Sequence, residues 1–227
     1  MRFRILAVLI AGALALVTVH PASAHTPIFI ERDINSPETA WPVGDYSISW
    51  AFYGRVIPAR APQYFSIEGR AGARLYANLE VPRIAGLENF RPSIAVVGPG
   101  LPAFEAPRGL TVPESYGGIL VDDPGATPRA QFDEPFSQTS YYRGPQLDIQ
   151  LPQTGRYYVV VRDETGGTGK YTLAIGTREV FGGGDPNWAQ KLRAFFDDAG
   201  QNPMPQPVST TEWSLPLPVF LPMWYKS

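Results

Sequence analysis

The stretch LDIQLPQTGRYYVVVRDETGGTGKYTLAIG, residues 147–176, decides the fold of this chain. Together with Gln146, it contains three alternating or apolar runs, at 146–151, 157–162 and 170–175, which glycine-containing turns separate. Apolar and polar residues that alternate with a period of two are typical of strands with one buried face, and short Gly-containing segments between them are typical of hairpin turns. The stretch therefore predicts consecutive antiparallel strands rather than helices.

The same pattern extends toward the N-terminus. Five more short runs read as strands, at residues 47–53, 63–68, 74–81, 93–98 and 118–121. No helical periodicity of useful length occurs between residues 26 and 181. We therefore expect an all-β fold, an antiparallel jelly-roll-like β-sandwich of about 7–9 strands.

Two of these segments carry a family resemblance. The string YFSIEGRAGARLYANL at residues 64–79, taken with the stretch quoted first, resembles the bacterial pre-peptidase C-terminal domain. The resemblance implies a jelly-roll-like sandwich on an exported protein, with a non-catalytic accessory or binding role. The chain departs from that family at PSIAVVGP, residues 92–99, and in the Pro-rich excursion of residues 99–145 that follows.

The N-terminus predicts export. Arg2 and Arg4 precede an apolar run, and the small residues Ala22-Ser23-Ala24 form a cleavage site, which together indicate a secretory signal peptide. Cleavage makes His25 the first residue and leaves it as the only histidine. The chain has no cysteine, so we expect neither a disulfide framework nor a lipid-modified cysteine. The expected location is the periplasm or the extracellular space.

The C-terminal part has a different character. Asp185 can cap a short helix with Pro186 at its first position, and apolar residues follow at helical spacing up to residue 198. The expected organisation is a signal peptide (1–24), a lead-in (25–46), the sandwich (47–181), a Gly break with a short helix (182–200) and a Pro-rich aromatic tail (201–227).

Composition and hydropathy argue against nucleic-acid binding and against a membrane-spanning helix. The formal net charge is −2 and the chain has no basic run, so nothing predicts nucleic-acid binding. No apolar segment after residue 24 is long enough to span a bilayer as a helix, so we expect no transmembrane helix after cleavage.

Metal binding is one functional alternative. An N-terminal histidine such as His25 can chelate Cu²⁺ through its α-amine and its imidazole. Carboxylates in sandwich loops can together hold Ca²⁺, which takes six to eight oxygen ligands. The candidate carboxylates are Asp122, Asp123, Asp133, Glu134 and Asp163.

Catalysis has weaker support, and we expect no enzyme activity and no obligatory cofactor. Paired carboxylates can hydrolyse glycosides without histidine, and Asp122, Asp133, Glu134 and Asp148 are the candidates. Their sequence positions do not fix the separation that this chemistry needs. Asp148 alternates outward between two apolar neighbours, which fits an exposed strand face.

The leading interpretation is an exported, non-catalytic binding or scaffolding protein whose partner is a protein or polysaccharide of the cell envelope. Exposed aromatic side chains can stack on sugars or peptides. The apolar tail can pack on its own domain, dock in a partner or lie at a membrane interface. The candidate contact residues are Tyr141, Tyr142, Phe220, Trp224 and Tyr225.

Overall fold

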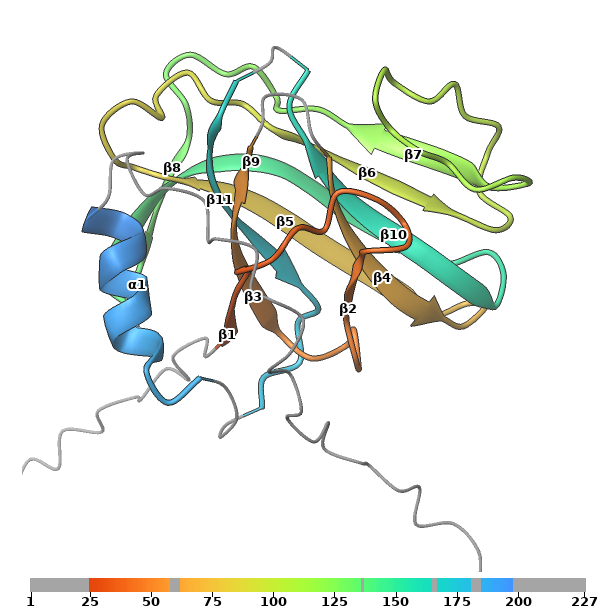
Figure 1. The fold of residues 1–227 in the computed structure, drawn as a ribbon, viewed down its shortest axis with the longest axis horizontal. Coiled ribbons are helices and arrows are strands. Elements are labelled where there is room, and N and C mark those ends of the chain that lie inside the picture. The colour runs from red at the N-terminus through yellow and green to blue at the C-terminus, as the bar shows by residue number, and fades with distance from the viewer. Residues whose placement is uncertain (1–24, 58–61, 136, 165–166, 181–184, 198–227) are drawn as a thin grey trace, which may run out of the picture.

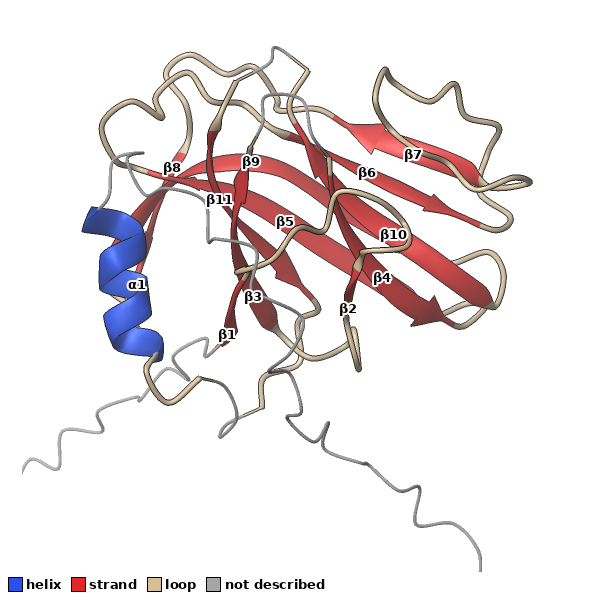
Figure 2. Cartoon of the chain, in the orientation of Figure 1, coloured by secondary structure: helices blue, strands red, loops and turns tan. Residues whose placement is uncertain are grey.

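The computed structural model describes residues 25–57, 62–135, 137–164, 167–180 and 185–197 (Figure 1). In these residues, eleven strands precede one helix, α1 (Trp188–Asp197), and Figure 2 shows that most of the described chain outside the loops is strand. The strands are β1 (Thr26–Phe29), β2 (Trp41–Pro42), β3 (Trp50–Val56), β4 (Gln63–Gly69), β5 (Arg74–Pro82), β6 (Ser93–Gly98), β7 (Gly117–Val121), β8 (Gln131–Glu134), β9 (Thr139–Gln150), β10 (Gly155–Arg162) and β11 (Gly169–Ile175).

The strands form two packed sheets, so the all-β sandwich is confirmed. The six-stranded sheet has the order β1-β3-β11-β5-β9-β8, and the five-stranded sheet has the order β2-β4-β10-β6-β7. The stretch 147–176 supplies strands to both sheets, because β10 lies between β4 and β6 while β11 lies between β3 and β5. The chain therefore crosses from one sheet to the other between β10 and β11, which connects the two layers.

Two details differ from the sequence-based expectation. The sheets are mixed rather than purely antiparallel, because β1 pairs in parallel with β3 and β2 pairs in parallel with β4. Both parallel strands belong to the segment 25–46, which adds one short strand to an edge of each sheet. The strand count in the described residues is eleven rather than 7–9, since β1, β2 and β8 add to the eight runs that the sequence predicts.

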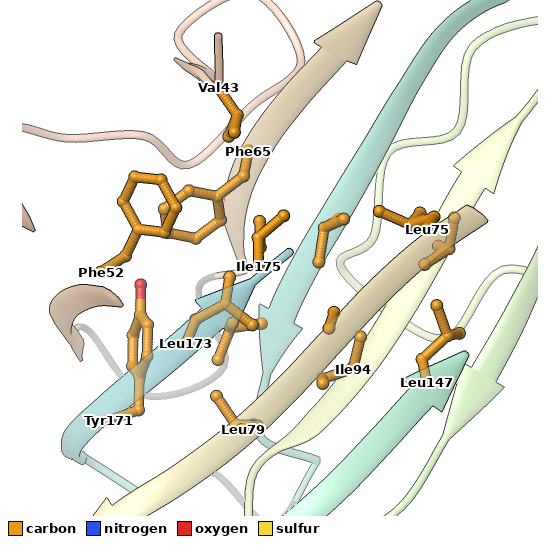
Figure 3. Packing of buried hydrophobic residues seen from close by; sticks show 14 of the residues in the cluster. Val43, Phe52, Phe65, Leu75, Leu79, Ile94, Leu147, Tyr171, Leu173 and Ile175 are labelled. Atoms are coloured by element: carbon orange, nitrogen blue, oxygen red, sulfur yellow. The ribbon is translucent and has the colours of Figure 1, made fainter. Parts of the chain in front are cut away.

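The main core lies between the sheets and is built from the inward positions of alternating strands. Figure 3 shows Phe52, Phe65, Leu79, Ile94 and Leu173 packed together. The inward side chains of both layers are almost completely buried. Burial of apolar surface at about 25 cal/mol per Å² is therefore the main stabilising contribution in a chain without disulfides.

Each sheet also has an outer face that is partly covered. Leu110 and neighbouring side chains of the segment after β6 pack on Tyr64, Val97 and Tyr158, on the outside of the five-stranded sheet. On the outside of the six-stranded sheet, α1 packs through Leu192 against Ala51 and Tyr53. No helix in the described part of the chain is long and apolar enough to cross a membrane.

The short helix begins close to where the sequence predicts it. Asp185 Oδ1 accepts a hydrogen bond from the Asn187 amide at 2.8 Å, and the Asp185 carbonyl accepts one from the Trp188 amide at 2.9 Å. These contacts satisfy amide groups at the start of the helix that have no partner within it. The predicted Gly break at 182–184, the signal peptide and the tail lie outside the described residues.

Candidate functional site

A cavity of about 290 Å³ opens on the outer face of the six-stranded sheet, next to α1, and we call it the sheet-face pocket. Its floor comes from outward-facing positions of three neighbouring strands, β3, β11 and β5. Its wall and roof come from the N-terminal residues, the β8–β9 hairpin and α1. The floor consists of Ala51, Tyr53, Asn78, Glu80, Thr172 and Ala174, and the wall and roof include His25, Phe132, Glu134, Tyr141, Arg143, Trp188 and Leu192.

Strand alternation explains why these side chains face the pocket. In β11, Tyr171, Leu173 and Ile175 enter the core, so Thr172 and Ala174 project from the opposite face. The same rule places the outward residues of β3 and β5 in the pocket. In an ordinary sandwich this face would meet water, whereas here Thr172 is only 5% exposed.

A lysine of β11 holds α1 over the pocket. Lys170 Nζ donates a hydrogen bond to the Phe195 carbonyl at 2.6 Å and lies 5.1 Å from the centre of the Phe195 ring. A cation is favourable near the C-terminus of a helix, where carbonyl groups have no partner within the helix. Near the other end of α1, Lys191 forms ion pairs with Glu31 at 2.8 Å and with Asp185 at 2.6 Å. The helix is therefore attached to β11 through Lys170 and to the segment that follows β1 through Glu31.

Two carboxylates line the pocket. The Glu80 side chain is 11% exposed, accepts a hydrogen bond from Asn78 Nδ2 at 3.1 Å and lies 3.8 Å from Arg143 Nη1. Burial raises the pKa of Glu80, and the nearby charge of Glu134 raises it further. Glu134 Oε2 accepts hydrogen bonds from the amide and hydroxyl of Ser137, which hold it within the β8–β9 hairpin.

The imidazole of His25 lies in the same pocket. Its Nδ1 forms a hydrogen bond of 2.5 Å with Ser49 Oγ. Burial lowers the pKa of His25, so the neutral imidazole is favoured, although the charge of Glu134 acts in the opposite direction. The adjacent backbone is also fixed, because the Thr26 amide donates to the Ser49 carbonyl at 2.8 Å.

The hydrogen bonds of His25 and Thr26 affect whether the N-terminus can chelate copper. Chelation by a terminal histidine uses its α-amine together with Nδ1 of the same residue, and Ser49 holds that nitrogen here. The next amide, of Thr26, is hydrogen-bonded as well, and Pro27 has no N–H. Copper chelation at His25 would therefore have to break the bond to Ser49, and the predicted copper site stays a prediction.

Buried hydroxyl groups complete the floor. Burial raises the pKa of Tyr53 well above its ordinary value, and burial likewise raises that of Tyr141. Thr139 Oγ1 donates a hydrogen bond to the Tyr141 hydroxyl at 3.2 Å. Side-chain hydrogen bonds with Thr139, Tyr53 and Thr172 lower the pKa of Tyr141 and so oppose the effect of burial.

The pocket brings together three of the residues that the sequence singles out: His25, Glu134 and Tyr141. Glu80, Thr172 and Arg143 were missed. The available signal was the alternation in residues 74–81, which places Glu80 on the same face as Tyr76 and Asn78. Sequence alone did not show that α1 would cover that face.

The other predicted metal ligands lie elsewhere. Asp123 is buried between Arg91, at 2.6 Å, and Arg129, at 3.1 Å. Asp133 accepts a hydrogen bond from Ser140 at 2.6 Å, on the exposed edge of β8. Asp163 accepts a hydrogen bond from the Gly167 amide, and Asp122 is exposed. Among the residues described, no three His, Cys, Asp or Glu side chains are grouped to hold a metal ion.

The remaining predictions concern contact residues and Asp148. Tyr142 packs against the main core, with the guanidinium of Arg129 over its ring at 4.8 Å. Asp148 is outward-facing, as expected, and pairs with Arg74 at 2.7 Å. The predicted tail contacts Phe220, Trp224 and Tyr225 lie outside the described residues.

The chain was compared with known proteins both by sequence and by structure. No protein-family model and no curated protein sequence matches this chain, so the resemblance to the pre-peptidase C-terminal domain stays a prediction. The solved structures that match include the Aeromonas hydrophila periplasmic inhibitor of g-type lysozyme PliG (14% identity, TM-score 0.35). They also include CorA of Methylomicrobium album BG8, a surface-associated copper-binding protein (13% identity, TM-score 0.35). Each alignment covers 68% of this chain and all of the other.

Proposed function

We propose that this chain is an exported, non-catalytic binding protein that holds a small ligand in the sheet-face pocket. The observation that carries the proposal is the buried, polar character of a sheet face that an ordinary sandwich exposes to water. Glu80 and Thr172 lie at outward strand positions, yet each is less than a tenth exposed. Small-molecule sites typically combine aromatic walls with a few convergent polar groups, and this pocket has both.

The energetic cost of the arrangement supports a functional role. Burying a charged carboxylate costs free energy unless partners compensate it, and the raised pKa of Glu80 indicates such a cost. A ligand that supplies a hydrogen bond to Glu80 would recover part of that cost on binding.

The test is native mass spectrometry of the chain that begins at His25, after export and cleavage by its own signal. A pocket-filling variant, Ala174→Phe, places a ring on the floor of the pocket, where Ala174 is 9% exposed. Gln150→Phe adds the same ring at an exposed position of β9 outside the pocket lining and serves as the control. We expect one small molecule per chain in the wild type and in Gln150→Phe, and none in Ala174→Phe.

A thermal-shift screen of small molecules provides a second readout on the same three proteins, because a ligand that binds only the folded state raises its melting temperature. Compounds that stabilise the wild type and Gln150→Phe, but not Ala174→Phe, would support the pocket as the binding site. If the Ala174→Phe protein retains the same small molecule or the same thermal shifts as the wild type, the pocket is not the binding site.

A further inference from the structure

We infer that cleavage between Ala24 and His25 stabilises the folded chain, because the new α-ammonium group of His25 lies close to the carboxylates of Glu134 and Glu179. This inference goes beyond the proposed function, since it rests on the predicted cleavage site and holds with or without a ligand in the pocket. It follows from the fixed position of His25, from the carboxylates around it and from the charges of the pocket lining.

Hydrogen bonds to the buried residue Ser49 fix the position of the chain at His25. The Ser49 hydroxyl lies 2.5 Å from Nδ1 of His25, and the Ser49 carbonyl accepts a hydrogen bond from the Thr26 amide at 2.8 Å. Thr26 also begins the parallel pairing of β1 with β3 (Figure 1). The α-nitrogen of His25 is bonded to the Cα that lies between these two hydrogen bonds, so it is within a few ångströms of both.

Two carboxylates act on this position. Glu134 lines the sheet-face pocket together with His25. The Ser49 amide donates a hydrogen bond to the Arg178 carbonyl at 2.9 Å, which brings the segment that contains Glu179 beside Ser49. Burial lowers the pKa of the His25 imidazole, and the charges of Glu134 and Glu179 act in the opposite direction. Charges that favour a cation on the imidazole also favour an ammonium group on the same residue.

Cleavage adds one positive charge at this position. Hydrolysis of the peptide bond between Ala24 and His25 by a signal peptidase consumes one water molecule, leaves a carboxylate on Ala24 and frees the α-amine of His25. An α-amine has an ordinary pKa of about 7.7–8.0, so it is mostly protonated below pH 7. In the uncut chain the same nitrogen is an uncharged amide. The positive charge therefore exists only in the processed chain.

The new charge balances the formal charges of the pocket lining. Among the described residues of the lining, Glu80 and Glu134 are acidic and Arg143 is basic. Burial favours the neutral form of the His25 imidazole. These side chains alone therefore carry one more negative charge than positive charge, and the α-ammonium group supplies the second positive charge. Because charges interact more strongly in a partly buried site than in water, this balance stabilises the folded state.

The experiment compares the chain that begins at His25 with the same chain acetylated at its α-amine, where acetylation restores the uncharged amide of the uncut chain. Acetylation near pH 6.5 favours the α-amine, because lysine side chains have an ordinary pKa of about 10.4 and stay protonated. Both proteins are then unfolded with urea at pH 6.5. We expect the equilibrium constant for unfolding to be about fivefold larger in the acetylated chain, the size of effect that a favourable ion pair near the surface has.

Two carboxylate variants and one control test whether charge causes the difference. Each variant is compared with its own acetylated form, so a change in its overall stability cancels. In Glu134→Gln and in Glu179→Gln, acetylation should change the unfolding constant only about twofold, because one of the two carboxylates that act on the α-ammonium group is neutral. Glu68→Gln removes an exposed carboxylate on the other sheet, where Glu68 pairs with Arg156, and should retain the full effect of acetylation. If Glu134→Gln does not fold, Glu179→Gln provides the comparison.

The outcomes separate this inference from the proposed function. An unfolding constant that acetylation leaves unchanged overturns the inference. An effect of acetylation that persists in full in both carboxylate variants also overturns it, because the bulk of the acetyl group rather than the lost charge is then the cause. No ligand enters these comparisons, so either result leaves the proposed function to be decided by the Ala174→Phe comparison.

Discussion

Replacing Leu192 with alanine should release α1 from the sheet without unfolding the sandwich. Leu192 is 4% exposed and packs against Ala51 and Tyr53 on the outer face of the six-stranded sheet. The helix has 10 residues, and isolated helices shorter than about 12–15 residues are marginal in water. The helix is therefore maintained by its packing on the sheet, and Leu192 is its most buried contact.

The magnitude follows from the burial of this side chain. Burying a leucine stabilises by about 1.5–3 kcal/mol, and Leu→Ala substitutions in cores cost about 2–5 kcal/mol. Because one side of α1 faces solvent, the site can collapse after the substitution, which favours the lower end, about 2 kcal/mol. At about 1.4 kcal/mol per factor of ten, the undocked population of α1 should rise about 30-fold.

Hydrogen exchange measured on peptides that cover residues 188–197 tests this directly. Amides of α1 should exchange about 30-fold faster in Leu192→Ala, while amides of β10 keep their protection. Leu110→Ala is the control, since Leu110 is 8% exposed and packs on the other sheet. Wild-type exchange in α1 of the Leu192→Ala protein would refute the reasoning that packing on the sheet holds this helix.

Three further predictions concern stability. Burial raises the pKa of Glu80, so the folded state is destabilised as pH rises from about 4.5 through the raised pKa. In urea melts, the Glu80→Gln variant should therefore have a free energy of unfolding higher than that of the wild type by on the order of 1 kcal/mol at pH 7, and this difference should be smaller at pH 4. Burial lowers the pKa of His25, so wild-type stability should fall as pH drops below about 6.5 toward that lowered pKa, and thermal melts of His25→Gln should show a shallower fall. A Cβ on Gly98 would lie 2.0 Å from Tyr157 Cδ1; Gly98→Ala should therefore cost about 1–3 kcal/mol, whereas Gly44→Ala, with nothing within 4 Å, should melt like the wild type.

Strand positions were predictable wherever one face of a strand is buried in the core. The run 93–98 coincides with β6, and the runs at 63–68 and 74–81 each fall one residue short of β4 and β5. The pattern failed for β1 and β2, which have four and two residues and contain proline. It also failed between residues 131 and 145, where proline and charged residues conceal β8 and the first part of β9.

The pocket was only partly predictable because its residues meet through sheet order rather than through sequence. Thr172 and Glu80 lie opposite each other only because β11 pairs with β5. The sequence indicated His25 through the predicted cleavage site and Glu134 through its acidic neighbour. It could not indicate that α1 would return to cover this face, since the contact of Lys170 with Phe195 depends on the tertiary fold.

The edges of the two sheets have a consequence for self-association. An exposed strand edge can recruit another chain by β-pairing, and proteins oppose this with short strands, proline, charge or covering loops. The edge strands β1 and β2 are short and contain Pro27 and Pro42, and the short edge strand β8 ends in Asp133 and Glu134. The remaining edge strand, β7, donates its Gly118 amide to the Pro102 carbonyl of a covering loop at 3.0 Å. These edges oppose aggregation of the folded chain through strand addition, and they do so without any disulfide among the described residues.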